Sequence, residues 1–253
     1  MLRHFLCAGL LLWTACTAQG SLYFEETFTY PDGSLSANSG GLWNAHSGTT
    51  GQMQVLGGQL VVSTSNTEDV NRSIGTTVTS GSVYAGFDFS VAASAPAAGG
   101  DYEYFAHFGN GSTDFTSRMD IVAGSGAADF SVGIAGNSGT ADATWATDLQ
   151  YNTVYRAIIG YNRDTGITSL WINPASEVST SIQSLADTND VTGFYFREST
   201  SSIGESISVD NLRVASTFGE ALNAVPEPST MSLLACTLGF AGLVRRRKVP
   251  VMS

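Results

Sequence analysis

Three ionisable residues close together in the chain are the first candidates for chemistry. Asp101, Glu103 and His107 lie on one predicted strand, and the alternation of side chains along a strand places all three on the same face. Residues two apart on a strand are roughly 6.5 to 7 Å apart at Cα, from which paired carboxylates can act on a glycosidic bond. Asp101 and Glu103 are the candidate acid/base pair. The alternative is a solvated strand face carrying an ion pair between Asp120 and Arg118.

Aromatic residues and one polar loop offer binding chemistry instead. Trp43, Trp145 and Trp171 are candidate glycan contacts if their rings are exposed, and packing in or beside the core is the alternative for each. Asp187, Asn189 and Asp190 supply oxygen ligands of the kind that calcium accepts, although their spacing matches no EF-hand loop. An ordinary Asx turn is the alternative there, so we expect no cofactor or metal beyond this one calcium candidate.

Histidine and cysteine usage limits the chemistry further. His46 and His107 are the only histidines from residue 21 to 224, which speaks against a His-rich metal site. Cys7, Cys16 and Cys236 all fall in predicted terminal segments. The central region therefore has no cysteine for a disulfide, a thiol nucleophile or a metal ligand.

The charge balance excludes some partners. Six arginines, no lysine and 21 acidic residues from Ser21 to Ala224 give that region a net charge of −15. Such a surface repels nucleic acid and anionic lipid. It suits a secreted protein that binds neutral sugars or uses divalent cations.

The elements that would position these residues are strands. Ten short segments are rich in β-branched and aromatic residues, and Gly, Asn, Asp and Ser separate them. Leu56–Gln59 and Asn162–Gly166 have the composition of hairpin connections. The pattern predicts one all-β domain, a two-sheet jelly-roll sandwich over residues 21–220. The expected strands are Leu22–Tyr30, Gln59–Thr64, Val83–Val91, Tyr102–Phe108, Ser117–Val122, Phe130–Ala135, Val154–Tyr161, Ile167–Ile172, Val191–Glu198 and Ser206–Val214.

Both ends of the chain carry targeting patterns. Residues 1–20 have the basic start, apolar run and small residues of a signal peptide, and lipidation at Cys16 is the alternative to simple cleavage. Residues 221–230 form a linker, 231–244 an apolar stretch suited to a single transmembrane helix, and 245–253 a basic cytoplasmic tail. The linker contains Val225, Pro226, Glu227 and Pro228, and the tail contains Arg245, Arg246, Arg247 and Lys248.

This C-terminal combination resembles the PEP-CTERM sorting signal. The resemblance implies that an exosortase cuts near Pro226 to Pro228 and passes the protein to the cell surface or extracellular matrix. Before processing, the protein would be held in the membrane by its C-terminal helix. The alternative is an anchor that is never cleaved.

A second resemblance covers almost all of the central region. The order of Trp43, a Gly57-Gly58 hairpin, Tyr104–Phe108, Leu170–Pro174 and Ile207–Val214 is similar to the concanavalin A-like lectin/glucanase sandwich. That family implies a concave sheet where oligosaccharides bind. The Glu-x-Asp-x-x-Glu motif of the glucanases is absent, because residues 101–106 read Asp-Tyr-Glu-Tyr-Phe-Ala. The absence of lysine from residues 21–224 also argues against a polysaccharide lyase.

We therefore expect a non-catalytic exported protein that binds extracellular polysaccharide or acts as a structural component of a biofilm matrix. The first alternative is a secreted glycan-active enzyme, a glycoside hydrolase or lyase, that uses Asp101 and Glu103. The second is an uncleaved membrane-anchored structural protein without a ligand.

Overall fold

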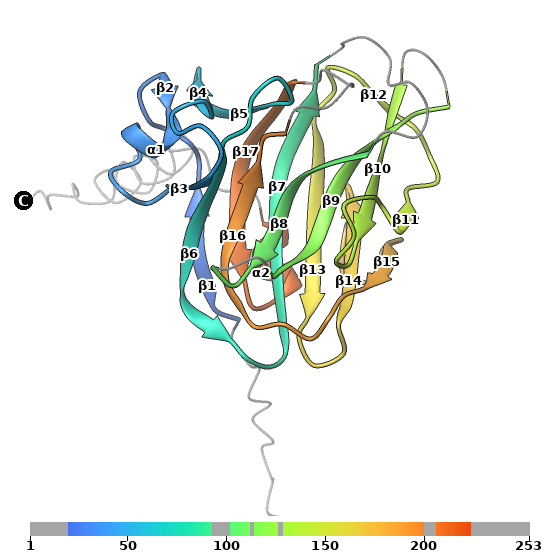
Figure 1. Ribbon diagram of the computed structural model, residues 1–253. Helices are drawn as coiled ribbons and strands as arrows, with labels where there is room; N and C mark the ends of the chain where they lie inside the picture. Colours follow the sequence, from blue (N-terminus) through green and yellow to red (C-terminus); the bar gives the residue numbers. More distant parts are fainter. Residues whose placement is uncertain (1–19, 93–101, 112–113, 126–128, 200–205, 224–253) are drawn as a thin grey trace, which may run out of the picture.

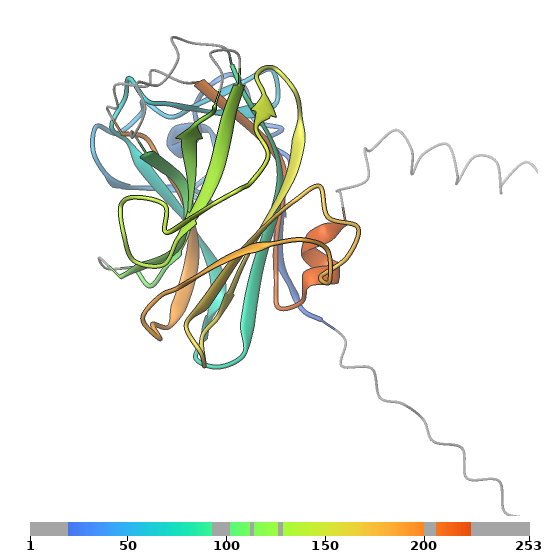
Figure 2. The same cartoon turned by 90° about the vertical axis from the view of Figure 1, so that its right-hand side faces the viewer.

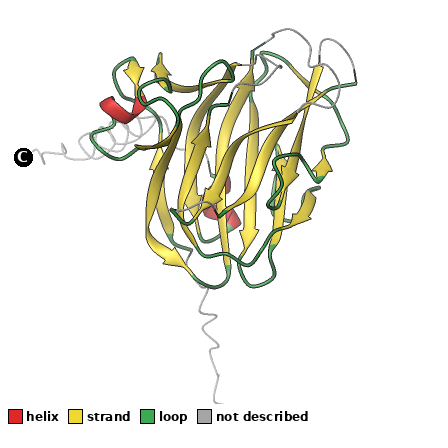
Figure 3. Cartoon of the chain, in the orientation of Figure 1, coloured by secondary structure: helices red, strands yellow, loops and turns green. Residues whose placement is uncertain are grey.

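Two antiparallel sheets packed face to face make up the folded part of the chain (Figures 1 and 3). The computed structural model describes residues 20–92, 102–111, 114–125, 129–199 and 206–223. The predicted signal peptide and the segments from Val225 to the basic tail lie outside these residues. Within the described ranges, no helix is long and apolar enough to cross a membrane.

The first sheet has nine strands among the described residues, and its main path runs β15-β14-β13-β7-β17-β5-β4-β2, with β1 paired to β17. Its last strand in the sequence, β17, lies in the middle of the sheet between β7 and β5. The strands are β1 (Leu22–Glu26), β2 (Gly33–Ser34), β4 (Gln54–Leu56), β5 (Gln59–Ser63), β7 (Ser82–Val91), β13 (Tyr155–Asn162), β14 (Ile167–Ile172), β15 (Ile182–Leu185) and β17 (Ser206–Ala215).

The second sheet has eight described strands in the order β11-β10-β9-β8-β16-β6-β3, with β12 also paired to β10. These strands are β3 (Asn44–Ser47), β6 (Asp69–Val78), β8 (Tyr102–Gly109), β9 (Phe115–Ala123), β10 (Asp129–Ala135), β11 (Ala143–Thr144), β12 (Leu149–Gln150) and β16 (Val191–Arg197). Two short helices, α1 (Leu35–Asn38) and α2 (Phe218–Leu222), complete the described elements.

Aromatic side chains from both sheets meet in the core. Phe87 of β7 has its ring centroid 6.1 Å from that of Phe105 in β8 and 6.2 Å from that of Phe196 in β16. These rings are 1% exposed or less. Burial of such side chains, each worth about 1.5 to 3 kcal/mol, drives the two sheets together. The two-sheet all-β sandwich predicted from the sequence is confirmed.

The ten predicted strands are all present, but the first ends earlier than expected. β1 ends at Glu26 because Phe28 takes a left-handed φ of 48° and the Tyr30 amide turns back to its carbonyl at 2.7 Å. The carboxylate of Glu26 accepts the Phe28 amide at 2.9 Å and stabilises this turn. Both predicted hairpins are confirmed, with positive φ at Gly57, Gly58 and Gly166.

The ten-residue strand β6 was missed. Its buried apolar residues are Val70, Ile74 and Val78, which are four apart and do not alternate. Gly75 has a φ of 75°, and the pairing with β16 shifts register between Ser73 and Val78. Residues four apart share one face of a regular strand, but the positions between them are Arg72 and Thr76, so apolar residues do not mark every second position.

Helix α2 lies on the outer face of the nine-stranded sheet (Figure 2). The Ala221 carbonyl accepts a hydrogen bond from Arg156 Nη2 at 2.7 Å, and the Glu220 carbonyl accepts one from Arg213 Nε at 2.8 Å. Gly86 of β7 permits this approach, because a Cβ there would lie 2.1 Å from the Ala221 oxygen. The helix therefore covers the middle of the sheet and leaves the β13–β15 side open.

Candidate functional site

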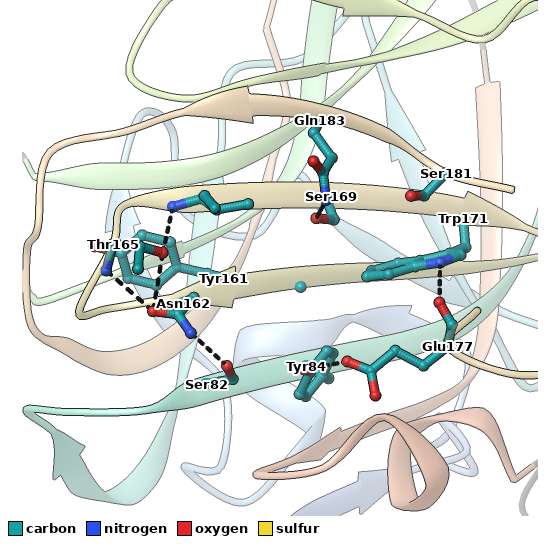
Figure 4. Close-up of a pocket in the computed structure, with 12 residues that line it drawn as sticks. Ser82, Tyr84, Tyr161, Asn162, Thr165, Ser169, Trp171, Glu177, Ser181 and Gln183 are labelled. Carbon is teal, nitrogen blue, oxygen red and sulfur yellow. Dashed lines mark hydrogen bonds between the residues drawn. The ribbon is translucent and has the colours of Figure 1, made fainter. Parts of the chain in front are cut away.

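The clearest binding geometry is an open groove on that uncovered side of the nine-stranded sheet (Figure 4). Register pairs Tyr84 of β7 with Gly160 of β13, Gly160 with Ser169 of β14, and Ser169 with Gln183 of β15. These four residues form one row across four strands. Since Gly160 has no side chain, the row is hollow at that position, and the groove encloses about 340 Å³.

Aromatic rings form one flank of the groove. A Cβ at Gly160 would lie 3.0 Å from the Tyr84 ring and 3.1 Å from Cζ3 of Trp171. Phe218 of α2 supports both rings from behind, with centroids 5.9 Å from Tyr84 and 5.0 Å from Trp171. The flank is therefore built from β7, β14 and α2, and packing fixes it in place.

Glu177, in the connection from β14 to β15, holds the two aromatic residues together (Figure 4). Its carbonyl accepts the Trp171 indole N–H at 3.1 Å, and its Oε1 accepts the Tyr84 hydroxyl at 2.7 Å. The pKa of Tyr84 is raised to about 12, mainly by burial and to a smaller extent by the hydrogen bond to Glu177. The phenol therefore remains a hydrogen-bond donor to Glu177 at physiological pH.

Apart from Ile167, the remaining side chains of the lining are polar and uncharged. Gln183 donates from Nε2 to Ser169 Oγ at 3.1 Å and keeps its amide oxygen exposed. Asn162 is used structurally, since its Oδ1 accepts the amides of Asp164 and Thr165, each at 3.0 Å. Hydroxyl and amide groups beside aromatic rings can bind the hydroxyls and C–H faces of a sugar. At about 340 Å³ the groove is at the small end of ligand-binding clefts.

Of the three candidate tryptophans, the structure brings only Trp171 to this groove. Trp171 is 5% exposed, so it contributes a ring edge and cannot act as an open stacking platform. Trp43 is 0% exposed and donates its indole N–H to Glu26 Oε2 at 3.0 Å, so its expected role in glycan contact is wrong. Trp145 is partly buried between β11 and β12, beside the other sheet, and its role stays a prediction.

The candidate acid/base pair cannot be placed. Asp101 lies outside the described residues, as does the side chain of Glu103. His107 is 2% exposed, and burial lowers its pKa to about 3. The expected alternation on this strand is wrong, because β8 shifts register against β9 on both sides of Ala106. Tyr104 consequently lies beside His107, with ring centroids 5.5 Å apart.

The alternative of a solvated strand face with an Arg118–Asp120 ion pair is also wrong. Asp120 is 0% exposed. Arg118 donates from Nη1 to the Ser138 carbonyl at 3.0 Å and lies 4.7 Å from the Tyr104 ring centroid. Arg197 approaches the same ring to 4.3 Å. The outer face of the eight-stranded sheet is thus packed around Tyr104.

In the loop proposed to bind calcium, two backbone carbonyls and one carboxylate already have protein partners. The Tyr161 hydroxyl donates to the carbonyls of Asp187 and Asn189 at 2.7 and 3.0 Å, and Asp190 pairs with Arg163 at 2.8 Å. Nowhere in the described ranges do three or more His, Cys, Asp or Glu residues gather as a metal site. Calcium binding by the Asp187–Asp190 loop stays a prediction.

A buried pair of carboxylates lies away from the groove. Glu68 is 0% exposed and accepts hydrogen bonds from Ser36 Oγ at 3.1 Å and from the Met53 amide at 2.6 Å. Glu198 is 2% exposed, and burial, with repulsion from Glu68, raises its pKa to about 7. Their hydrogen bonds tie loops to the core, so we assign this pair a structural role.

Sequence reasoning missed Tyr84, Gly160, Glu177 and Gln183. Alternation along β14 could have placed Ser169 and Trp171 on one face. The row that joins them to β7 and β15 depends on strand order. Tyr84 of β7 and Gly160 of β13 are 76 positions apart in the sequence, yet they are paired directly in the sheet. A single sequence carries no signal for that pairing.

Comparison with known proteins identifies the C-terminal segment. Residues 224–248 match the PEP-CTERM protein-sorting motif. No curated protein matches the chain. Similar solved structures include basic winged bean lectin with Tn-antigen, which is 14% identical with a TM-score of 0.48 over 76% of this chain and 96% of that one.

Two other structures show comparable likeness. The lectin from Bauhinia forficata in complex with GalNAc is 13% identical, with a TM-score of 0.45 over 76% of this chain and 98% of that one. A sialidase is 14% identical, with a TM-score of 0.46 over 90% of this chain but 22% of the sialidase. At these scores the likeness says nothing about what this chain binds. The chain is a two-sheet β-sandwich that carries a PEP-CTERM protein-sorting motif, which implies export and processing by an exosortase.

Proposed function

We propose that this protein is sorted to the cell surface or extracellular matrix and binds polysaccharide there without cleaving it. The observation that carries the proposal is the groove of Figure 4, where Tyr84 and Trp171 flank a hollow at Gly160 and Gln183 offers an amide. Fixed aromatic rings beside uncharged hydrogen-bonding groups fit a sugar chain. The open ends of the groove suit a polymer, which can continue past it in both directions.

The surface charge supports an extracellular carbohydrate partner. A net charge of −15 over residues 21–224 opposes binding to nucleic acid or anionic lipid. The sorting motif supports the location, because its match implies passage across the inner membrane. Removal of the predicted C-terminal helix near Pro226 to Pro228 would release the sandwich, whose main core cluster among the described residues runs from Phe24 to Val214.

Binding can be tested with the ectodomain, residues 21–224, in native gels that contain soluble neutral polysaccharides. Slower migration indicates binding, and new reducing ends in the same samples would indicate cleavage. The variant Gln183→Ala removes a groove amide, and Gln59→Ala removes an equally exposed glutamine from β5 as the control. We expect retardation by at least one polymer, weakened by the first variant only. Failure of every polymer to retard the folded protein would contradict the proposal.

The catalytic alternative depends on Asp101 and Glu103. New reducing ends that disappear in Glu103→Gln would establish it and overturn the non-enzymatic proposal. The anchored alternative predicts that the C-terminal helix remains in the mature protein. The mass of the protein recovered from its host, with and without the exosortase gene, decides between cleavage and anchoring.

A further inference from the structure

We propose that the groove selects uncharged glycans over uronate-containing ones, and that Glu177 sets this selectivity. The inference rests on the proposed function and names its ligand class. Among the described residues that line the groove, Glu177 alone carries a charge. A sugar carboxylate placed there would meet a like charge, whereas a sugar hydroxyl would meet a hydrogen-bond acceptor.

Different atoms of Glu177 perform two tasks. Its carbonyl oxygen and Oε1 hold Trp171 and Tyr84, as described above. Its Oε2 makes no hydrogen bond within the described residues, and the side chain is exposed to solvent. One carboxylate oxygen therefore fixes the aromatic flank, while the other has no hydrogen-bond partner among the described residues.

Among the described residues, the arginines of the nine-stranded sheet are already paired and do not offset this charge. Arg156 is paired with Asp88 at 3.2 Å, Arg163 with Asp190 at 2.8 Å, and Arg213 with Glu25 at 3.0 Å. These arginines lie on or beside the strands of the nine-stranded sheet, and each is already held by a carboxylate. A uronate in the groove would thus lose hydration without gaining a positively charged partner.

The variant Glu177→Gln separates charge from positioning. Its amide oxygen can still accept the Tyr84 hydroxyl, and its backbone carbonyl still accepts the Trp171 N–H. The probes are a neutral glucan and a neutral galactan, and the same polymers oxidised at C6 to uronates. We expect the wild-type ectodomain to bind at least one neutral polymer and its oxidised form more weakly. Glu177→Gln should keep neutral binding and gain about three- to tenfold for the oxidised polymer at low salt.

Asp114→Asn is the matched control, because it removes the same charge from an exposed side chain outside the groove lining. It should leave binding of the oxidised polymer unchanged. Glu177→Ala should weaken neutral binding as well, since it releases Tyr84. Thermal unfolding of each variant confirms that the fold is intact.

The outcomes are distinguishable. Binding of no neutral polymer would overturn the proposed function itself. Equal binding of neutral and oxidised polymers by the wild type would overturn the selectivity and leave the function standing. Equal gains in Glu177→Gln and Asp114→Asn would show that net charge, and not Glu177, excludes uronates, which would also overturn the inference.

Discussion

Replacement of Glu198 by glutamine should change how the stability of the protein depends on pH. The Glu198 carboxylate is 2% exposed; its Oε1 accepts the Ser63 amide at 3.0 Å and Asn66 Nδ2 at 3.3 Å. Its Oε2 is buried and has no hydrogen-bond partner among the described residues. Burial, with repulsion from Glu68, raises its pKa from 4.5 to about 7.

The sign and size of the effect follow from these two pKa values. Below pH 4.5 the carboxyl is neutral in both the folded and the unfolded chain. As the pH rises from 4.5 to 7, the unfolded chain loses the proton first, so stability falls. A difference of about 2.5 pKa units corresponds to about 3 kcal/mol, all of it lost above pH 7.

Urea unfolding followed by tryptophan fluorescence, from pH 4.5 to 8.5, measures this loss. The free energy of unfolding of Glu198→Gln minus that of the wild type should rise by about 3 kcal/mol across this range. Any fixed cost of burying the amide cancels in that change. Gln183→Ala, which removes no ionisable group from an exposed position, is the control and should give a flat difference. A change below about 1 kcal/mol for Glu198→Gln would refute the assignment of a raised pKa to this buried carboxyl.

Three further predictions address the groove, the core and the second sheet. Gly160→Ala should weaken polysaccharide binding in native gels, because its Cβ would lie 3.0 to 3.1 Å from the Tyr84 and Trp171 rings and displace them. Gly139→Ala, where a Cβ meets nothing within 4 Å, should not. Glu26→Ala should lower the free energy of unfolding by about 3 to 5 kcal/mol, because the Glu26 carboxylate accepts hydrogen bonds from Trp43, Tyr30 and Arg72. Glu25→Ala, at the half-exposed neighbouring position, should lower the free energy of unfolding by at most about 1 kcal/mol. The imidazole of His107, with its pKa lowered to about 3, should keep its neutral NMR shifts down to about pH 4, and protonation near pH 6.5 would contradict its burial.

The sandwich was predictable because its core strands follow simple patterns. β14 and β17 alternate or run apolar with β-branched residues, and the glycines that break the chain mark its hairpins. Strand β6 was missed because Arg72 and Thr76 stand between its buried apolar residues Val70, Ile74 and Val78, so the sequence shows no apolar alternation there. Bulges misplaced His107 relative to Tyr104. The local alternation of apolar and polar residues therefore predicts where strands lie. It fails to predict which sheet face a side chain occupies once a bulge shifts the register.

Of the residues that line the groove, only one was predicted from the sequence as a ligand contact. Trp171 was a candidate because of its residue type, while its partners come from strands whose adjacency no local pattern indicates. Glu177 lies in a connection between strands and meets Tyr84 of β7 only after β7, β13 and β14 have paired. Hydrogen bonds between residues 93 positions apart depend on topology, which a single sequence does not display.

The central position of β17 has a consequence for the order of events during export. A chain that crosses the inner membrane from its N-terminus delivers β17 last among the strands, shortly before the sorting motif at residues 224–248. Until then β7 and β5 lack the strand that joins them, and β1 lacks its partner. The polypeptide therefore stays open and able to translocate almost to its end. Closure of the sandwich then coincides with arrival of the sorting segment at the membrane, so a truncated chain would present unpaired strand edges to periplasmic proteases.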